Sequence, residues 1–126
     1  MSYSLLLVDD QDTVLRVLEY VFTHKGHRVL TANSGKAALE LLRKEPVDAA
    51  VIDMHMPEMD GFQTAEALLT LARERGDRLR VWMMTGAFST AAQKRAQEIG
   101  AVALLAKPFD YDRLCVDLAR ELGSRD

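Results

Sequence analysis

The sequence predicts an α/β fold in which five parallel strands form one open, doubly wound sheet. Short apolar runs alternate with longer amphipathic stretches five times along the 126 residues. Strands that alternate with helices run parallel, because each helix returns the chain to the same end of the sheet. Five such units are too few for a closed eight-stranded barrel. We therefore expect an open sheet and a single domain over residues 1–126.

Five short runs supply the predicted strands. Each is rich in Val, Leu, Ile or Met and shows little polar alternation, which is typical of strands buried on both faces. In chain order the runs are residues 4–8, 28–32, 48–52, 80–84 and 101–106. For a sheet of this class we expect the flavodoxin-like strand order 2-1-3-4-5.

Between these runs, apolar residues recur at intervals of three and four, which predicts five amphipathic helices. The apolar stripes are Val14, Val17, Leu18, Val21 and Phe22; Ala38, Leu41 and Leu42; Phe62, Ala65, Leu69 and Ala72; Ala92, Ala96 and Ile99; and Leu114, Leu118 and Leu122. Residues that favour helix ends bracket the stripes. The expected N-caps are Ser34, Ser89 or Thr90, and Asp110, and the expected stops are Gly26, Gly76, Gly100 and Gly123.

Composition excludes several classes of protein. The 16 basic and 19 acidic residues give a net charge of −3, which argues against nucleic-acid binding by this domain. No apolar run approaches the ~18–20 residues of a membrane span, and the N-terminus lacks the pattern of a signal peptide. Cys115 is the only cysteine, and with three scattered histidines it cannot build a zinc site. We expect a cytoplasmic protein that does not bind membranes.

Acidic residues follow two strands that the expected order makes neighbours. Asp9 and Asp10 follow the first strand, and Asp53 follows the third. Neighbouring strands lie ~4.8 Å apart, so three carboxylates meet at one crevice. Two unit charges ~5 Å apart repel by roughly 3 kcal/mol at an effective dielectric constant of ~20. Oxygen ligands with room for water favour Mg²⁺ as the neutralising cation.

Two further polar residues follow the fourth and fifth strands. Thr85 ends the fourth strand, and Lys107 ends the fifth, roughly 10 Å from Asp53 by strand spacing. A metal, a carboxylate nucleophile, a hydroxyl and an ammonium form the set of groups needed to hold a phosphoryl group on a carboxylate. The alternative for Asp9, Asp10 and Asp12 is that one of them caps the first helix.

Four segments carry a family resemblance: "LLLVDD", "VIDMHMPEMDGF", "MMTGA" and "AKPF". In this order and spacing they resemble the signature segments of bacterial response-regulator receiver domains, and the resemblance covers essentially the whole chain. It implies that a histidine kinase or a histidine phosphotransfer protein phosphorylates Asp53. It also implies contacts to the phosphoryl group from Thr85 and Lys107, and a cis peptide bond before Pro108. The implied Mg²⁺ ligands are Asp9 through water, Asp10, Asp53 and the backbone carbonyl of His55.

The resemblance implies a two-state signalling module that catalyses only its own phosphorylation and dephosphorylation, and is otherwise not an enzyme. Phosphorylation is expected to switch the face formed by the fourth helix, the fifth strand and the fifth helix, for a downstream protein partner or output domain. Two features depart from the family pattern. Leu104 occupies a position that is usually Tyr or Phe, and the acidic residues used in receiver dimers are missing from "GAVALLAKPF". We expect phosphorylation to move or uncover Leu104, which then offers an apolar contact to a partner.

Three alternatives stay open. The chain can be the N-terminal receiver of a longer regulator or hybrid kinase. A flavodoxin-like flavin binder is opposed by Asp9 and Asp10, which stand where a phosphate-cradling loop would be rich in Ser, Thr and Gly. A phosphatase with an aspartate nucleophile usually carries a second acid two residues later, and here that residue is His55. The His55 imidazole could itself act as a metal ligand or a base.

Overall fold

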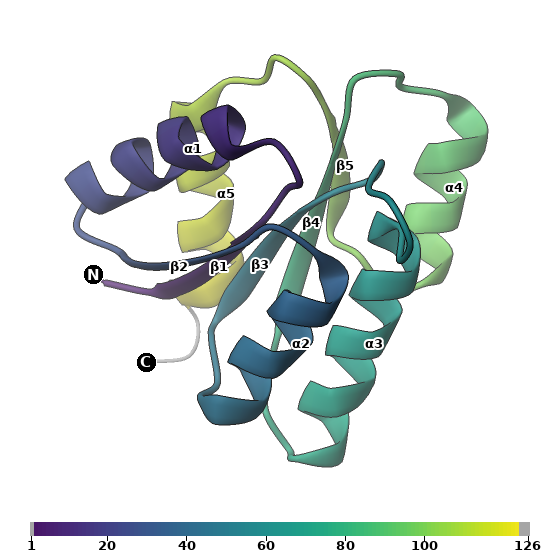
Figure 1. Cartoon of the computed structure of the whole chain (residues 1–126). Coiled ribbons are helices and arrows are strands. Elements are labelled where there is room, and N and C mark those ends of the chain that lie inside the picture. The colour runs from purple at the N-terminus through teal and green to yellow at the C-terminus, as the bar shows by residue number, and fades with distance from the viewer. Residues whose placement is uncertain (1, 124–126) are drawn as a thin grey trace.

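Five parallel strands in the order β2-β1-β3-β4-β5 form the sheet, as the sequence predicts (Figure 1). This arrangement comes from a computed structural model that describes residues 2–123, so residues 1 and 124–126 of the expected domain lie outside the described range. The elements are β1 (Ser4–Val8), α1 (Asp12–His24), β2 (Arg28–Ala32), α2 (Gly35–Lys44), β3 (Ala49–Asp53), α3 (Gly61–Glu74), β4 (Arg80–Thr85), α4 (Thr90–Glu98), β5 (Ala103–Ala106) and α5 (Tyr111–Leu122).

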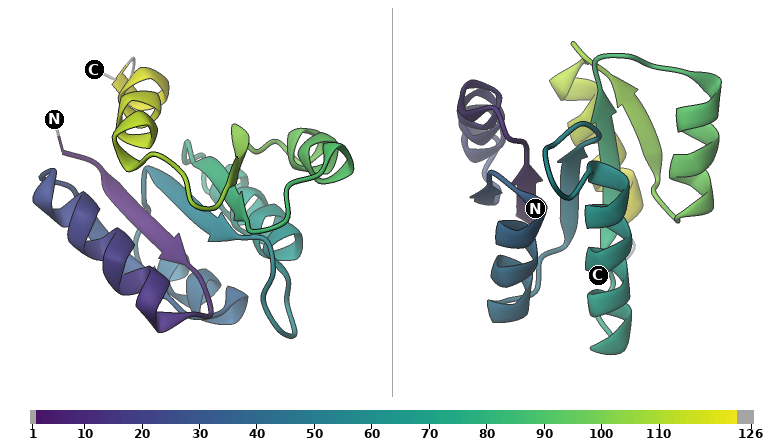
Figure 2. Two further views of the ribbon diagram at one scale, coloured as in Figure 1. Left: turned by 90° about the horizontal axis from the view of Figure 1, so that it is seen from above. Right: turned by 45° about the vertical axis from the view of Figure 1, so that its right-hand side comes forward.

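The helices divide between the two faces of the sheet and form two apolar cores (Figure 2). One core joins the sheet to α2, α3 and α4, and the other joins it to α1 and α5. All five residues of β3 are buried, because helices cover the central strand on both sides. Trp82 on β4 is also fully buried, as expected for a residue in the middle of a strand. No helix within residues 2–123 is long and apolar enough to cross a membrane.

Side-chain caps start four of the five helices. The Ser34 and Ser89 hydroxyls accept hydrogen bonds from backbone amides at the starts of α2 and α4, and the Asp110 carboxylate does so in α5. Asp60 starts α3 with a reciprocal capping box. The first helix differs, because its N-cap is Gln11 and makes no side-chain capping bond. The acidic residues near β1 are therefore not used as a cap for α1.

In two helices, the residues that are buried against the sheet differ from those of the predicted apolar stripe. On α1, Val17 is 49% exposed, and the unpredicted Leu15 is buried with Leu18. On α3, Leu68 is fully buried, and the predicted Leu69 is only partly buried. Several choices of stripe fit the same spacing rule, and the direction from which the sheet approaches selects one of them.

Three strands also differ from their predicted limits. β3 is shifted by one residue and ends at Asp53, which pairs in register with Met84. β4 extends to Thr85, in register with Ala106. β5 begins at Ala103, because the Ala101 amide still closes the end of α4 with a hydrogen bond to the Ala96 carbonyl.

Candidate functional site

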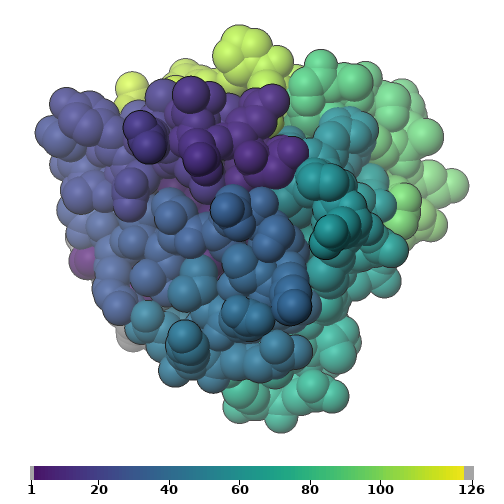
Figure 3. Space-filling view, in the orientation of Figure 1, coloured from purple at the N-terminus to yellow at the C-terminus, as the bar shows by residue number. Residues whose placement is uncertain are grey.

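The carboxyl ends of β1 and β3 bring three acidic side chains together. One oxygen from each of Asp9, Asp10 and Asp53 lies within 4.8 Å of the others. Asp9 is fully buried, Asp53 is 5% exposed, and Asp10 faces solvent. Figure 3 shows the β1–α1 segment (purple) beside the segment before α3 (teal) on one face of the molecule. The structure thus confirms that the first and third strands place their terminal acids in one cluster.

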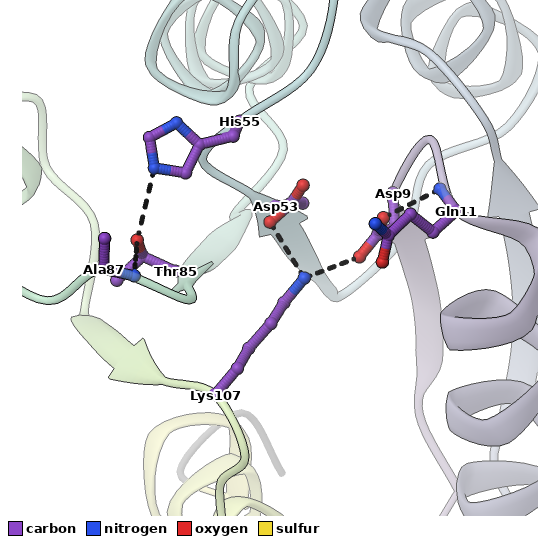
Figure 4. A network of polar contacts seen from close by, with 7 residues as sticks. All are labelled: Asp9, Gln11, Asp53, His55, Thr85, Ala87 and Lys107. Atoms are coloured by element: carbon purple, nitrogen blue, oxygen red, sulfur yellow. Dashed lines mark hydrogen bonds and ion pairs between the residues drawn. The ribbon is translucent and has the colours of Figure 1, made fainter.

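Lys107 reaches this cluster from the end of β5 (Figure 4). Its Nζ lies 3.0 Å from Asp9 Oδ2 and 3.0 Å from Asp53 Oδ1. The other oxygen of Asp9 accepts a hydrogen bond of 2.9 Å from the Gln11 amide. Three carboxylates facing one ammonium leave an excess of two negative charges. Such an all-oxygen set, open to solvent at Asp10, fits a hard divalent cation such as Mg²⁺.

Burial and charge shift the ionisation of two of these groups. Burial raises the pKa of the Asp53 carboxyl above its ordinary value. The hydrogen bond from Lys107 opposes that shift, and the negative charges of Asp9 and Asp10 reinforce it. Burial also works against the Lys107 ammonium, but its hydrogen bonds to Asp53 and Asp9 outweigh this, so the pKa of Lys107 lies above its ordinary value.

Thr85 lies at the end of β4, between the strands that carry Asp53 and Lys107. Its side chain is fully buried, and its Oγ1 accepts a hydrogen bond of 3.0 Å from the Ala87 amide. The His55 Nε2 lies 3.5 Å from the same oxygen (Figure 4). The imidazole therefore faces Thr85, and within residues 2–123 it is not part of the acidic cluster. A metal contact through the His55 carbonyl stays a prediction.

The start of α3 contributes a residue that our sequence analysis missed. The Gly61 amide donates a hydrogen bond of 3.0 Å to the Met54 carbonyl. A Cβ atom placed on Gly61 would lie 2.2 Å from the carbonyl oxygen of Asp53. The available signal was the glycine that ends the "VIDMHMPEMDG" segment, directly before Phe62, the first residue of a predicted apolar stripe.

Two predictions near β5 have different outcomes. The peptide bond between Lys107 and Pro108 is cis, as the resemblance implied. Leu104, expected to move or be uncovered on phosphorylation, is 7% exposed in the present structure. It packs in the core that includes Ala96 of α4, so α4 covers it although β5 is an edge strand. In this conformation α4 shields Leu104 from a partner, and its exposure on phosphorylation stays a prediction.

Comparison with known proteins agrees with this geometry. The family model of the response regulator receiver domain matches residues 5–119. Sporulation initiation phosphotransferase F of Bacillus subtilis is 32% identical over 114 residues, which are 90% of this chain and 89% of that protein. The regulatory protein AtoC of Escherichia coli is 34% identical over 118 residues, but the chain spans only 25% of its length.

A solved structure gives the same result at the level of the fold. The chemotaxis protein CheY4 of Vibrio cholerae superposes with a TM-score of 0.85 at 27% identity. The match covers 95% of this chain and 98% of that one. With its flavodoxin-like strand order and its match to the family model over nearly its whole length, the chain belongs to the receiver domain family of response regulators.

Proposed function

We propose that Asp53 is the phosphoacceptor of this receiver domain and takes its phosphoryl group from a histidine kinase or a histidine phosphotransfer protein. The observation that carries the proposal is the cluster of three carboxylates, two of which, those of Asp9 and Asp53, share the ammonium of Lys107. In the transfer, a carboxylate oxygen of Asp53 forms a bond to phosphorus while the bond from phosphorus to the donor's imidazole nitrogen breaks. Membership of the family supports phosphoryl acceptance in two-component signalling.

Asp9, Asp10, Asp53 and the His55 carbonyl are the proposed ligands of Mg²⁺, with Asp9 acting through water. The ion would neutralise the excess negative charge of the cluster and the charge that develops on the transferring group. The outward position of Asp10 and the buried position of Asp9 support this division of roles. Asp9 already accepts hydrogen bonds from Lys107 and Gln11, which orient its carboxylate before an ion binds.

Lys107 and Thr85 are proposed to contact the phosphoryl group. The Lys107 Nζ lies 3.0 Å from Asp53 Oδ1, so a phosphoryl group attached to Asp53 would lie beside a positive charge. The Thr85 hydroxyl can donate its proton to a phosphoryl oxygen, and in the present conformation its oxygen accepts from the Ala87 amide. Turning toward the phosphoryl group would disturb that contact, which links the chemistry to the segment before α4.

The readout surface is proposed to be the face formed by α4, β5 and α5. Only Ala96 of α4 is buried, so this helix has the smallest apolar anchor of the five. Leu104 lies beneath it on β5. A shift of α4 would expose Leu104 to a downstream protein or to an output domain. Relatives such as AtoC extend well beyond the matched region, which is consistent with such a domain in a longer protein.

Incubation with a small-molecule phosphodonor and Mg²⁺ tests the proposal. Intact-protein mass spectrometry should detect one added phosphoryl group on the wild-type protein and none on Asp53→Asn. The control is Asp112→Asn, because the Asp112 side chain is 81% exposed on α5 and should not affect the reaction. Modification of Asp53→Asn to the wild-type extent would overturn the assignment.

A further inference from the structure

We propose that Gly61 is a positioning residue for the phosphoacceptor. The absence of a side chain at the first residue of α3 lets the helix seat directly against the backbone of Asp53 and Met54. This contact sets where the Asp53 carboxylate and the His55 carbonyl lie. The inference rests on the proposed function, because these two groups are its phosphoacceptor and one of its Mg²⁺ ligands.

The close approach is between backbone atoms on both sides. A Cβ atom on Gly61 would lie 2.2 Å from the Asp53 carbonyl oxygen, 2.6 Å from Met54 Cα and 2.9 Å from the Asp53 carbonyl carbon. Contacts this short do not occur in packed proteins, so either α3 or the end of β3 must move. Gly61 does not have a positive φ angle, so the requirement for glycine is steric and not conformational.

Both partners in this contact are held in place. The Asp60 carboxylate accepts from the Gln63 amide at 2.8 Å, and the Gln63 side chain accepts from the Asp60 amide at 2.9 Å. The Met54 amide donates to the Met84 carbonyl of β4 at 2.7 Å. Because α3 also buries several apolar side chains, it cannot retreat without a loss of core packing. An added methyl group would therefore displace the segment that carries Asp53, which has a 3.0 Å contact with Lys107.

Gly35 provides a matched control. It is also buried and is also the first residue of a helix, directly after an N-cap. A Cβ atom on Gly35 would lie 2.3 Å from Thr64 Oγ1 and 2.8 Å from Met59 Sδ. The Met59 side chain can rotate away, whereas Thr64 Oγ1 would have to give up its 2.8 Å hydrogen bond to the Asp60 carbonyl. These contacts are to side chains, and they include no atom of Asp53. The same substitution at the two glycines therefore separates general destabilisation from displacement of the phosphoacceptor.

The test compares wild type, Gly61→Ala and Gly35→Ala at a temperature where circular dichroism shows each to be folded. Isothermal titration gives the Mg²⁺ affinity, and mass spectrometry gives the initial rate of phosphorylation. We expect Gly61→Ala to lower both by about tenfold or more, the scale expected when a reacting group is misplaced by up to an ångström. Gly35→Ala should stay within about twofold of wild type for both. A folded Gly61→Ala that matches wild type, or equal losses in the two variants, would overturn the proposal.

A second pair of variants keeps the inference testable if Gly61→Ala does not fold. Asp60→Ser removes the charge of the N-cap but keeps a capping oxygen, whereas Asp60→Ala removes both. Loosening the start of α3 should make Asp60→Ala bind Mg²⁺ about two- to threefold more weakly than Asp60→Ser. Equal affinities would count against the inference. Phosphorylation of Asp53→Asn would instead refute the proposed function, so the two failures can be told apart.

Discussion

At the scale of single residues, Lys107 shares one ammonium between two carboxylates that are almost fully buried. Removing one partner of a buried ion pair leaves uncompensated charge in a poorly solvated place. Here the loss of Lys107 would leave Asp9 and Asp53 facing each other with no cation between them. Lys107 therefore supports the folded site before any ion or phosphoryl group arrives.

We expect Lys107→Met to lower the free energy of unfolding by about 2–4 kcal/mol at neutral pH without Mg²⁺. Urea denaturation measures the change. Lys25→Met is the control, because Lys25 forms an exposed ion pair with Asp112 on the surface. Exposed pairs contribute about 0–1 kcal/mol, so the control should stay close to wild type. A Lys107 variant as stable as the Lys25 variant would mean that the buried carboxylates need no internal cation.

Asp53 is expected to destabilise the ion-free protein at neutral pH. Its pKa is raised in the folded state, chiefly by burial. Between the unfolded and the folded pKa, the folded state holds more protons, so stability falls as pH rises through that interval. Asp53→Asn stays neutral and should melt a few degrees higher than wild type at pH 7 in EDTA.

The difference between Asp53→Asn and wild type should shrink as the pH falls from above the raised pKa of Asp53 toward the ordinary Asp value near about 4, and should be smallest below that value. Glu40→Gln, which changes an exposed carboxyl on α2, controls for a general effect of removing charge. Thermal melts from acid to neutral pH measure both variants. An Asp53→Asn protein that melts below wild type at pH 7 would show that its pairing with Lys107 outweighs the cost of burial.

At the scale of elements, α4 differs from the other helices because its anchor to the sheet is small. Ala96 is its only buried residue, and the core beneath it includes Leu104 of β5. Most of its other residues are polar, so little apolar burial holds it against β5. A helix with few buried apolar contacts opens at a lower free energy than its neighbours.

Leu104→Ala should therefore loosen α4 selectively. Deletion of a buried leucine side chain costs about 2–5 kcal/mol in general. We expect hydrogen exchange of the α4 amides to accelerate more than that of the α1 and α5 amides. Leu118→Ala, a fully buried residue of α5 on the opposite face of the sheet, is the control and should spare α4. Uniform acceleration in Leu104→Ala would mean that α4 is not a separate opening unit.

At the scale of the whole molecule, binding of an ion at the proposed Mg²⁺ site should raise the free energy of unfolding. The three carboxylates are brought together only when β1 and β3 pair, so the unfolded chain lacks the arrangement that would bind an ion. A ligand that binds only the folded state raises the free energy of unfolding by RT ln(1 + [L]/Kd). Mg²⁺ should thus stabilise the entire domain and not only the loops around Asp53.

We expect about 2.7 kcal/mol of added stability when the Mg²⁺ concentration is about 100 times its Kd. Thermal melts over a Mg²⁺ series measure this, with matched ionic strength from NaCl. Asp10→Asn should lose most of the gain, because it removes the charge of the proposed exposed ligand while leaving the buried carboxylates in place. Stabilisation of Asp10→Asn equal to that of wild type would argue that the ion binds elsewhere.

Much of the fold follows from local sequence. The apolar runs of the strands and the caps at Ser34, Ser89 and Asp110 are local signals; the caps lie where the sequence predicted them, and the strands lie within one or two residues of their predicted limits. The position of Asp53 at a strand end next to Asp9 follows from strand order alone. Such features depend on residue type and on spacing along the chain, so they can be recognised without knowledge of distant contacts.

Other features depend on contacts between distant segments. Tertiary packing determined that α1 buries Leu15 and exposes Val17, since the sheet approaches from one direction only. It also covered Leu104 with α4 and seated Gly61 on the backbone of Asp53. The sequence by itself determined the order and approximate limits of the strands and helices and which polar groups follow the strands. The tertiary structure decided which side of each element is covered and how closely two backbones approach, because these depend on the arrangement of segments far apart in the chain.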